Sequence, residues 1–212
     1  MTVVGILGGT GPLGRGLARW FAVAGHEVVL GSRDPERGTA AAGGLGPRVT
    51  GGSHRRAAAA DLVVVAVPYA GHATLLTELA EPLSGKVVID CVSPLGFDSR
   101  GPYALPVPDG SAAQEAQRLL PGSTVVGAFH HISAVVLLDP ATTELEGDIL
   151  VVTEDRAAGT TVIELVASLP RLRGVYAGRL RNAGQVEALT ANLIAINRRY
   201  SAHAGLQITG LS

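Results

Sequence analysis

The fold is decided by the stretch V-V-G-I-L-G-G-T-G-P-L-G at residues 3–14, which joins an apolar run to a Gly-x-Gly-x-x-Gly pattern. The three glycines of the pattern are Gly9, Gly11 and Gly14. Between a strand and a helix, the first glycine permits a tight turn, the second lets a pyrophosphate approach the backbone, and the third lets the helix pack closely on the strand. The N-terminus of the helix adds oriented N–H groups for the anion. The sequence therefore predicts that the chain binds a dinucleotide.

The residues after the second predicted strand indicate which dinucleotide this is. An NAD site usually has an acidic residue there, about 20 residues after the glycines, to accept hydrogen bonds from the ribose 2′-OH. This chain has Ser32 and Arg33 instead, with Arg37 one helical turn further on. A hydroxyl and two guanidinium groups suit the 2′-phosphate of NADP, although the same residues are also compatible with a solvated loop. Asp34 precedes Pro35 and is expected to cap the next helix.

Composition places the chain among α/β proteins of ordinary charge. The 212 residues are 47% hydrophobic and carry a net charge of −1, so a sizeable core is expected, and neither a nucleic acid nor a membrane is expected as a partner. Cys91 is the one cysteine and excludes an internal disulfide. No secretory signal and no membrane-spanning run are recognised, so a cytoplasmic location is expected.

Apolar runs and helical segments alternate along the chain, which predicts a Rossmann-type, doubly wound and mostly parallel sheet. Residues 62–67 are wholly apolar, as in strands that are buried on both faces. The glycine-rich residues 43–52 are assigned no helix or strand, and the Pro- and Gly-rich residues 96–110 are expected to be a long loop that acts as a lid or binding loop. We expect an NADP-binding Rossmann domain over residues 1–150 and a small C-terminal part of helical and extended segments over residues 151–212.

Three segments, residues 8–18, 25–33 and 195–206, resemble the F420-dependent NADP reductase family. The resemblance spans nearly the whole chain. It implies a cytoplasmic, homodimeric enzyme that transfers a hydride between NADPH and the deazaflavin coenzyme F420, with the small C-terminal part contributing to the F420 pocket. Some members of the family have lysine where this chain has arginine at position 37. The NADP contacts that the resemblance implies are Thr10, Gly11, Pro12, Leu13, Ser32, Arg33 and Arg37.

Further candidates lie where predicted strands end, because ligands of open α/β sheets bind at the carboxyl ends of the strands. The predicted cofactor-binding residues of this group are Val67, Pro68, His72, Val92, Ser93, Pro94 and Ala134. His130 and His131 follow a buried strand and are candidates for orienting F420, or are core histidines satisfied by the backbone. Arg198, Arg199 and His203 either pair with the anionic tail of F420 or belong to a solvated helix face.

The chemistry expected of this chain needs little protein machinery. Hydride transfer between two organic cofactors requires positioning and exclusion of water, with neither a nucleophile nor a metal from the protein. Cys91 is expected to pack as a small hydrophobe, and a metal site is not expected at His130 and His131, because neighbours on an extended segment point to opposite faces. Two alternatives stay open: an NADPH-dependent reductase of a flavin or a small carbonyl or imine compound, and an NADP-sensing module without turnover.

Overall fold

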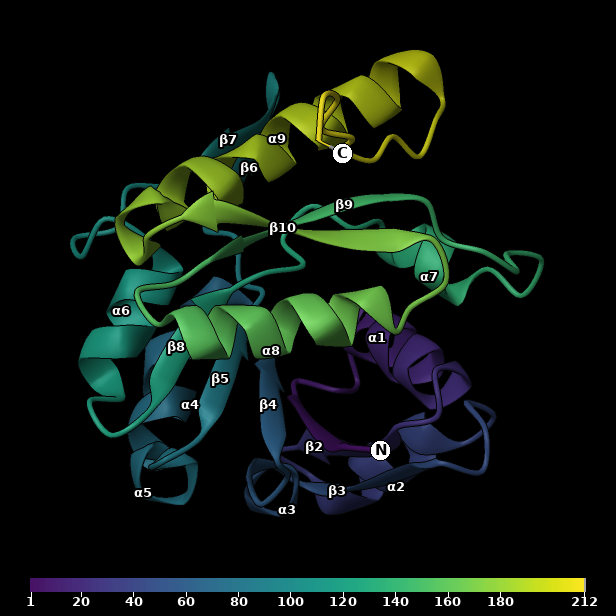
Figure 1. Cartoon of the computed structure of the whole chain (residues 1–212), viewed down its shortest axis with the longest axis vertical. Helices are drawn as coiled ribbons and strands as arrows, with labels where there is room; N and C mark the ends of the chain where they lie inside the picture. Colours follow the sequence, from purple (N-terminus) through teal and green to yellow (C-terminus); the bar gives the residue numbers. More distant parts are fainter. Residues whose placement is uncertain (212) are drawn as a thin grey trace.

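The protein is built on one large twisted sheet (Figure 1). The structure is a computed structural model and describes residues 1–211. Within these residues, eight strands form a sheet in the order β10-β9-β8-β5-β4-β1-β2-β3, and two more form a separate hairpin. Neighbouring strands of the large sheet are parallel except β8 and β9, which meet in antiparallel orientation at Gly127 and Val152. The predicted Rossmann-type, mostly parallel sheet is confirmed.

The strands of the large sheet are β1 (Val3–Leu7), β2 (Glu27–Ser32), β3 (Val49–Ser53), β4 (Leu62–Val65), β5 (Val87–Asp90), β8 (Thr124–Gly127), β9 (Gly147–Val152) and β10 (Leu172–Gly178). The hairpin consists of β6 (Leu95–Asp98) and β7 (Gly101–Ala104). The helices are α1 (Pro12–Val23), α2 (Pro35–Ala42), α3 (His54–Ala58), α4 (His72–Glu78), α5 (Ala80–Leu83), α6 (Ala112–Leu119), α7 (Ala134–Leu138), α8 (Arg156–Ala167) and α9 (Ala183–Tyr200), with 3-10 turns at Tyr69–Gly71 and Leu180–Asn182.

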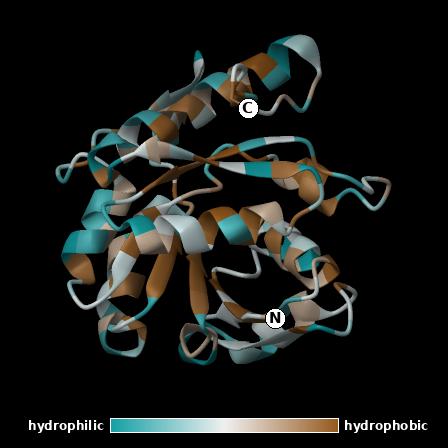
Figure 2. Ribbon diagram, in the orientation of Figure 1, coloured by the Kyte–Doolittle hydropathy of each residue, from teal (hydrophilic) through white to brown (hydrophobic). Residues whose placement is uncertain are grey.

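Helices cover both faces of the sheet and divide the core in two. One cluster includes Phe21 of α1, Leu137 of α7 and Val162 of α8, and the other includes Ala57 of α3, Leu76 of α4 and Ala116 of α6. The central strands between them are largely apolar, as the hydropathy colours of Figure 2 show for β4 and β5; β4 is wholly apolar, and β5 is apolar up to Asp90. All four residues of β4 are buried, which is the consequence of covering a parallel sheet on both sides.

Three segments differ from the sequence-based expectation. Residues 49–53, to which the sequence assigned no strand, form β3 at the edge of the sheet, paired with β2. Residues 96–110, expected as a long loop, contain most of the antiparallel hairpin of β6 and β7, whose turn is closed by the N–H of Arg100 donating to Asp98 Oδ1 at 2.7 Å. The short helix α7 was not predicted either; Ser133 caps it by accepting from the N–H of Val136.

The C-terminal third of the chain continues the same sheet. β9 and β10 extend it beyond β8, so the expected boundary at residue 150 falls inside β9. After β10 the long helix α9 crosses above the sheet, and the last residues return beneath it (Figure 1). Two loops at the carboxyl ends of parallel strands, those after β5 and β8, are thereby brought close to α9.

Candidate functional site

The loop between β1 and α1 is shaped by small residues. Gly8 has a φ of +79°, and its carbonyl oxygen accepts a hydrogen bond from the N–H of Gly11 at 3.1 Å. Gly8, rather than the predicted Gly9, therefore makes the tight turn. Gly9 is required for another reason, since a Cβ there would lie 2.7 Å from the Leu30 side chain of β2. A Cβ on Gly14 would lie 2.9 Å from the Gly8 oxygen, so Gly14 does permit the close approach of helix and strand that its position predicts.

No side chain of residues 1–211 caps the N-terminus of α1. Gly11 is the N-cap residue, and no side chain accepts from the first turn, where Pro12 has no N–H to satisfy. A Cβ on Gly11 would meet nothing closer than 3.5 Å, so its surface is open. Thr10 and Leu13 are half-buried beside this end of the helix. The backbone thus offers an anion site at the point where a pyrophosphate is expected.

The residues that are predicted to bind the 2′-phosphate lie at the end of β2 and just after it. Ser32 is buried, with its hydroxyl accepting from the N–H of Asp34, while Arg33 and Arg37 are exposed. Among residues 1–211, no carboxylate lies within 4.0 Å of either guanidinium. Asp34 is occupied in capping α2, as predicted, and accepts from the N–H of Glu36 at 2.9 Å. Two cations are therefore free to meet an anionic ligand.

A hollow opens between the end of β2, the start of α3 and helix α4; we call it the α3–α4 hollow. It includes the predicted residues Arg33, Val67 and Pro68, and adds His54 and Glu78, which sequence reasoning missed. The pairing of Ser32 with Ser53 across β2 and β3 places His54 beside Arg33. Since β3 was not predicted, nothing in the sequence placed His54 at this edge. The full lining is Arg33, His54, Val67, Pro68, Ala70, Gly71, Thr74, Leu75 and Glu78.

The structure does not bring the His72 side chain into this hollow. The ring is fully buried, with Nε2 at 2.7 Å from Asp90 and Nδ1 at 3.0 Å from Glu115. Burial lowers the pKa of His72, but the hydrogen bonds and charges of the two carboxylates outweigh it and raise the pKa to about 9. Both ring nitrogens are thus engaged inside the protein, which leaves the ring without a surface for the predicted cofactor contact.

The buried acid Asp90 also shapes the loop after β5. Its Oδ1 accepts from the N–H of Val92 at 2.9 Å, within the predicted segment Val92, Ser93 and Pro94. Glu187 of α9 lies in the same part of the core and accepts from two N–H groups at the start of α6, those of Ala112 and Ala113. Burial raises the pKa of Glu187 to about 7 against the lowering effect of those two hydrogen bonds. The carboxylates of Asp90 and Glu187 therefore hold in place the loop after β5 and the start of α6.

Thr190 of α9 connects the loops after β5 and β8. Its hydroxyl donates to the backbone oxygen of His130 at 3.0 Å and lies 3.2 Å from Ser93 Oγ. Because the single hydroxyl proton of Thr190 goes to a carbonyl, Ser93 must donate to Thr190. Ser93 Oγ then presents only lone pairs to a ligand, so it selects hydrogen-bond donors. Thr190 was missed from the sequence because helix periodicity alone does not show which helix face meets a loop end.

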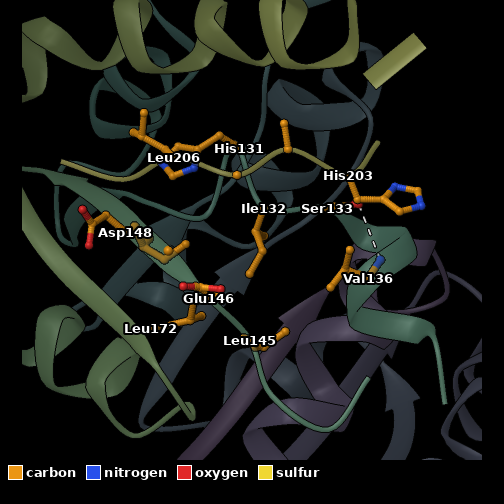
Figure 3. A pocket seen from close by; sticks show the side chains of 14 residues that line it. His131, Ile132, Ser133, Val136, Leu145, Glu146, Asp148, Leu172, His203 and Leu206 are labelled. Carbon is orange, nitrogen blue, oxygen red and sulfur yellow. Dashed lines mark hydrogen bonds between the residues drawn. The ribbon is translucent and has the colours of Figure 1, made fainter. Parts of the chain in front are cut away.

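A second hollow lies between the loop after β8 and helix α9; we call it the α9 hollow. It is lined by predicted residues, including His130, His131 and Ala134, together with Thr190 and Arg198. It continues into the neighbouring pocket of Figure 3, where His131, Ile132 and Ser133 face His203 and Leu206 of the returning chain end. Arg199 lines neither the α9 hollow nor the pocket of Figure 3. The full lining of the α9 hollow is residues 130–135, Thr190, Leu193, Ile194, Asn197, Arg198 and residues 201–204.

The two histidines of this edge are both buried and neutral at physiological pH. Burial lowers the pKa of each to about 4. His131 Nε2 accepts from the N–H of Leu150 at 3.2 Å, so this ring is satisfied by the backbone. His130 differs, because neither of its ring nitrogens has a partner among residues 1–211. An unpartnered buried imidazole is costly, which makes His130 the member of the pair with unused hydrogen-bonding capacity.

The chain end that closes the pocket is fastened by an ion pair. Arg173 of β10 binds both oxygens of Asp148 at 2.7 and 2.8 Å and also donates to the carbonyl of Ile208 at 2.7 Å. The N–H of Asp148 donates to the carbonyl of Leu206 at 2.7 Å. The wall formed by residues 203–206 is thus attached to β9 and β10, far in sequence from the glycine loop.

Residues 1–211 offer little for nucleophilic catalysis by a cysteine or for a metal site. Cys91 is buried, and burial raises the pKa of its thiol well above the ordinary value, so it packs as expected and is a poor nucleophile. Residues 1–211 contain no group of three or more His, Cys, Asp and Glu side chains that would hold a metal. In the same residues, no helix is both long and apolar enough to cross a membrane.

Comparison with known proteins settles the family. A family model described as "NADP oxidoreductase coenzyme F420-dependent" matches residues 3–94. The F420-dependent NADP reductase of Methanothermobacter thermautotrophicus is 36% identical over 98% of this chain and 95% of its own length. This chain belongs to the F420-dependent NADP reductase family. The family member of Methanocaldococcus jannaschii is 33% identical over 98% of both chains.

A solved structure supports the same family membership at the level of the fold. A crystal structure from Arthrobacter sp. FB24, provisionally assigned as an F420-dependent NADP reductase, superposes with a TM-score of 0.84 at 30% identity. The match covers 99% of this chain and 100% of that one, so the β9–β10 extension and α9 are part of the family fold.

Proposed function

We propose that this protein transfers a hydride between NADPH and coenzyme F420, as the names of its relatives state for those proteins. The observation that carries the proposal is the arrangement of two ligand-sized hollows on one sheet edge. The α3–α4 hollow adjoins Arg33, which has no ion pair among residues 1–211, and the α9 hollow adjoins His130. The loop after β5 lies between them and is bonded through Thr190 to the second.

The residues present fit NADP. The glycine loop leaves a surface without side chains over Gly11, the first turn of α1 has no side-chain cap, and Ser32, Arg33 and Arg37 can receive a phosphate dianion. Thr10, Pro12, Leu13, Val67, Pro68, Val92 and Pro94 would border the same ligand, and Ser93 would accept a hydrogen bond from it.

The α9 hollow would hold F420. His130, whose buried ring nitrogens have no partner among residues 1–211, belongs to its lining, and Arg198 and His203 line the hollow where an anionic tail would be attracted. When both molecules are bound, the nicotinamide and the deazaflavin supply the redox chemistry, and the hydride passes between them. The protein holds the two rings in place and excludes water, and Ala134 at the start of α7 leaves space beside the loop. The small C-terminal part, residues 151–212, contributes α9 and the chain end to this pocket.

The test is an absorbance assay of purified protein with NADPH and oxidised F420, followed at the visible band of F420. We expect bleaching that requires both substrates and is slower with NADH. Bleaching with FMN or a small imine but not with F420 would contradict the proposal and favour a different acceptor. Binding of NADPH without turnover of any acceptor would favour a sensing module.

We further propose that the protein is a cytoplasmic homodimer. Large apolar side chains are exposed on the hairpin and on the end of α9, namely those of Phe97, Tyr103, Ile196 and Tyr200. The hairpin and α9 are neighbours, because α9 contacts β7. Light scattering during size-exclusion chromatography is expected to give twice the mass of one chain, and the mass of a single chain would contradict the proposal.

A further inference from the structure

Helix α9 meets the start of α6 at a junction that is held by one buried carboxylate. Glu187 is 2% exposed, and its two oxygens accept from the N–H groups of Ala112 at 2.9 Å and Ala113 at 3.1 Å. The next N–H of α6, that of Gln114, donates to the cap residue Ser111 at 3.0 Å. The first three N–H groups of α6 are therefore satisfied, two of them by a side chain from another helix.

A glycine on the first turn of α9 lets the chain approach closely at the same junction. A Cβ on Gly184 would lie 2.7 Å from the backbone oxygen of Gly110, which comes just before α6. Ala183 and Val186 belong to the same buried core cluster as Ala116 of α6. The beginning of α9 is thus seated on α6 by close packing as well as by hydrogen bonds, which leaves the helix little freedom to slide.

The carboxylate holds this junction without a cationic partner. Among residues 1–211, no Lys, Arg or His side chain pairs with Glu187 within 4.0 Å. Burial and the charge of Asp90 raise the pKa of Glu187 to about 7, against the lowering effects of the two N–H groups and of His72. An amide in its place would offer one oxygen and turn an NH2 group toward the second N–H. The junction therefore requires a carboxylate rather than an amide.

We propose that Glu187 is a positioning residue for the α9 hollow and acts through Thr190. Thr190 follows one helical turn later on the same face of α9. Its hydroxyl donates to the backbone oxygen of His130 at 3.0 Å and accepts from Ser93 Oγ at 3.2 Å. A shift of α9 by roughly an ångström would break both hydrogen bonds. The inference rests on the proposed function, because F420 is the ligand assigned to this hollow.

The remaining turns of α9 carry the effect to one ligand. Leu193, Ile194, Asn197 and Arg198 line the α9 hollow, and they move with the helix that bears them. The α3–α4 hollow is lined by residues between Arg33 and Glu78, and α9 contributes none of them. Loss of the Glu187 anchor is therefore expected to weaken the binding of F420 and to leave the binding of NADPH nearly unchanged.

The experiment is a double-substitution cycle at pH 8, where most of the Glu187 carboxylate is ionised. Binding of F420 and of NADPH is titrated separately by the fluorescence of each cofactor, so no turnover occurs. We expect Glu187→Gln to weaken F420 binding about 5- to 30-fold and NADPH binding less than about twofold. In a Thr190→Val background, Glu187→Gln weakens F420 binding by less than about a further twofold, because the contact that it positions is already absent.

Gly184→Ala disturbs the same junction and leaves the carboxylate in place. Its Cβ displaces the start of α9 from Gly110, so we expect the same selective loss of F420 binding. This variant also tests the proposal if Glu187→Gln does not fold. Glu164→Gln is the matched control, because Glu164 is an exposed carboxylate on α8 outside both hollows. It is expected to keep both affinities.

Equal weakening of F420 and NADPH binding in Glu187→Gln and Gly184→Ala overturns the proposal, since it would assign the junction to the stability of the whole fold. Additive effects of Glu187→Gln and Thr190→Val overturn it as well. Hydride transfer from NADPH to F420 is measured on the same preparations. Turnover with additive effects overturns the inference alone. A selective, non-additive loss of F420 binding without turnover leaves the inference in place and contradicts the proposed function, and absence of F420 binding in the unmodified protein contradicts both.

Discussion

At the scale of single residues, the glycine loop separates the requirements of folding from those of binding. Gly14 is enclosed, since a Cβ there would meet two backbone atoms at 2.9 Å, whereas a Cβ on Gly11 would make an ordinary contact at 3.5 Å. We expect Gly14→Ala to lower the melting temperature and Gly11→Ala to leave it within a degree or two, because only the first forces the backbone apart. Both are expected to weaken NADPH binding at least tenfold, Gly11→Ala by occupying the surface under the pyrophosphate.

Thermal unfolding and NADPH titration of both variants check this separation. A large loss of stability in Gly11→Ala would contradict it. The sequence pattern already assigns approach of the pyrophosphate to Gly11 and helix–strand packing to Gly14, and the contacts that a Cβ would make at each position agree with this division. It also assigned the turn to Gly9, because the positive φ of Gly8 depends on where β1 ends and not on the spacing of the motif.

Arg33 carries a prediction about cofactor choice. Its guanidinium is exposed and has no acidic partner within 4.0 Å among residues 1–211, so its charge is available to a 2′-phosphate. We expect Arg33→Asp to raise KM for NADPH by roughly 10- to 100-fold and to change KM for NADH much less, since NADH lacks that phosphate. Arg100→Asp, on the hairpin turn, is the control for a change of surface charge. An unchanged ratio of the two KM values in Arg33→Asp would exclude Arg33 from the phosphate site.

At the scale of elements, the sequence predicts the buried strands and the helices well, because apolar runs and helix caps are local signals. β4 and the Asp34 cap of α2 are examples. β3 was missed because Gly51 and Gly52 weaken a strand and suggest a loop. The structure shows why they are there: Gly51 lies against the backbone of Gly38 in α2, and a Cβ on it could not be accommodated. That requirement comes from tertiary packing and leaves no local trace.

The buried ion pair between His72 of α4 and Asp90 of β5 makes the free energy of unfolding depend on pH. The pKa of His72 is raised to about 9 from 6.5, so its contribution is complete below pH 6.5 and is lost as the pH rises through 9. We expect the free energy of unfolding to fall by about 3 kcal/mol across that window on this account, since one pKa unit corresponds to about 1.4 kcal/mol. Burial holds the pKa of Glu187 at about 7, which acts in the same direction at lower pH.

Urea unfolding at pH 7.5 and pH 9 isolates the histidine, because Glu187 has already titrated at the lower of these values. We expect His72→Gln to be less stable than the unmodified protein at pH 7.5 and to show a much smaller further loss at pH 9. His203→Gln, at the exposed chain end, is expected to retain the original pH dependence. If His72→Gln keeps the full slope between the two pH values, the ion pair with Asp90 does not account for it.

At the scale of the whole molecule, the site is assembled from both ends of the chain. The order β3-β2-β1-β4-β5-β8 brings the glycine loop and the loops after β5 and β8 to one edge, and β9 and β10 extend the sheet toward the returning chain end. The sequence motifs located the first part, since it is encoded in about 35 consecutive residues. The wall of residues 203–206 depends on Arg173, Asp148 and backbone groups that meet only after folding.

Because the two hollows are built from different parts of the chain, we expect that a substitution can weaken the binding of one ligand without weakening the other. Arg173→Gln removes the ion pair with Asp148 and weakens the donor to Ile208, which leaves the chain end held to β9 mainly by backbone groups, so the wall of the pocket of Figure 3 should loosen. We expect KM for F420 to rise at least fivefold, while binding of NADPH at the opposite end of the sheet edge stays within twofold. Arg179→Gln is the matched control, because Arg179 directly follows the same strand but pairs with Glu154 at the surface, away from the pocket. Loosening of a local wall cannot weaken a site built on β1 and β2. Equal losses of affinity for F420 and NADPH in Arg173→Gln would therefore mean that the chain end supports the whole sheet rather than one pocket.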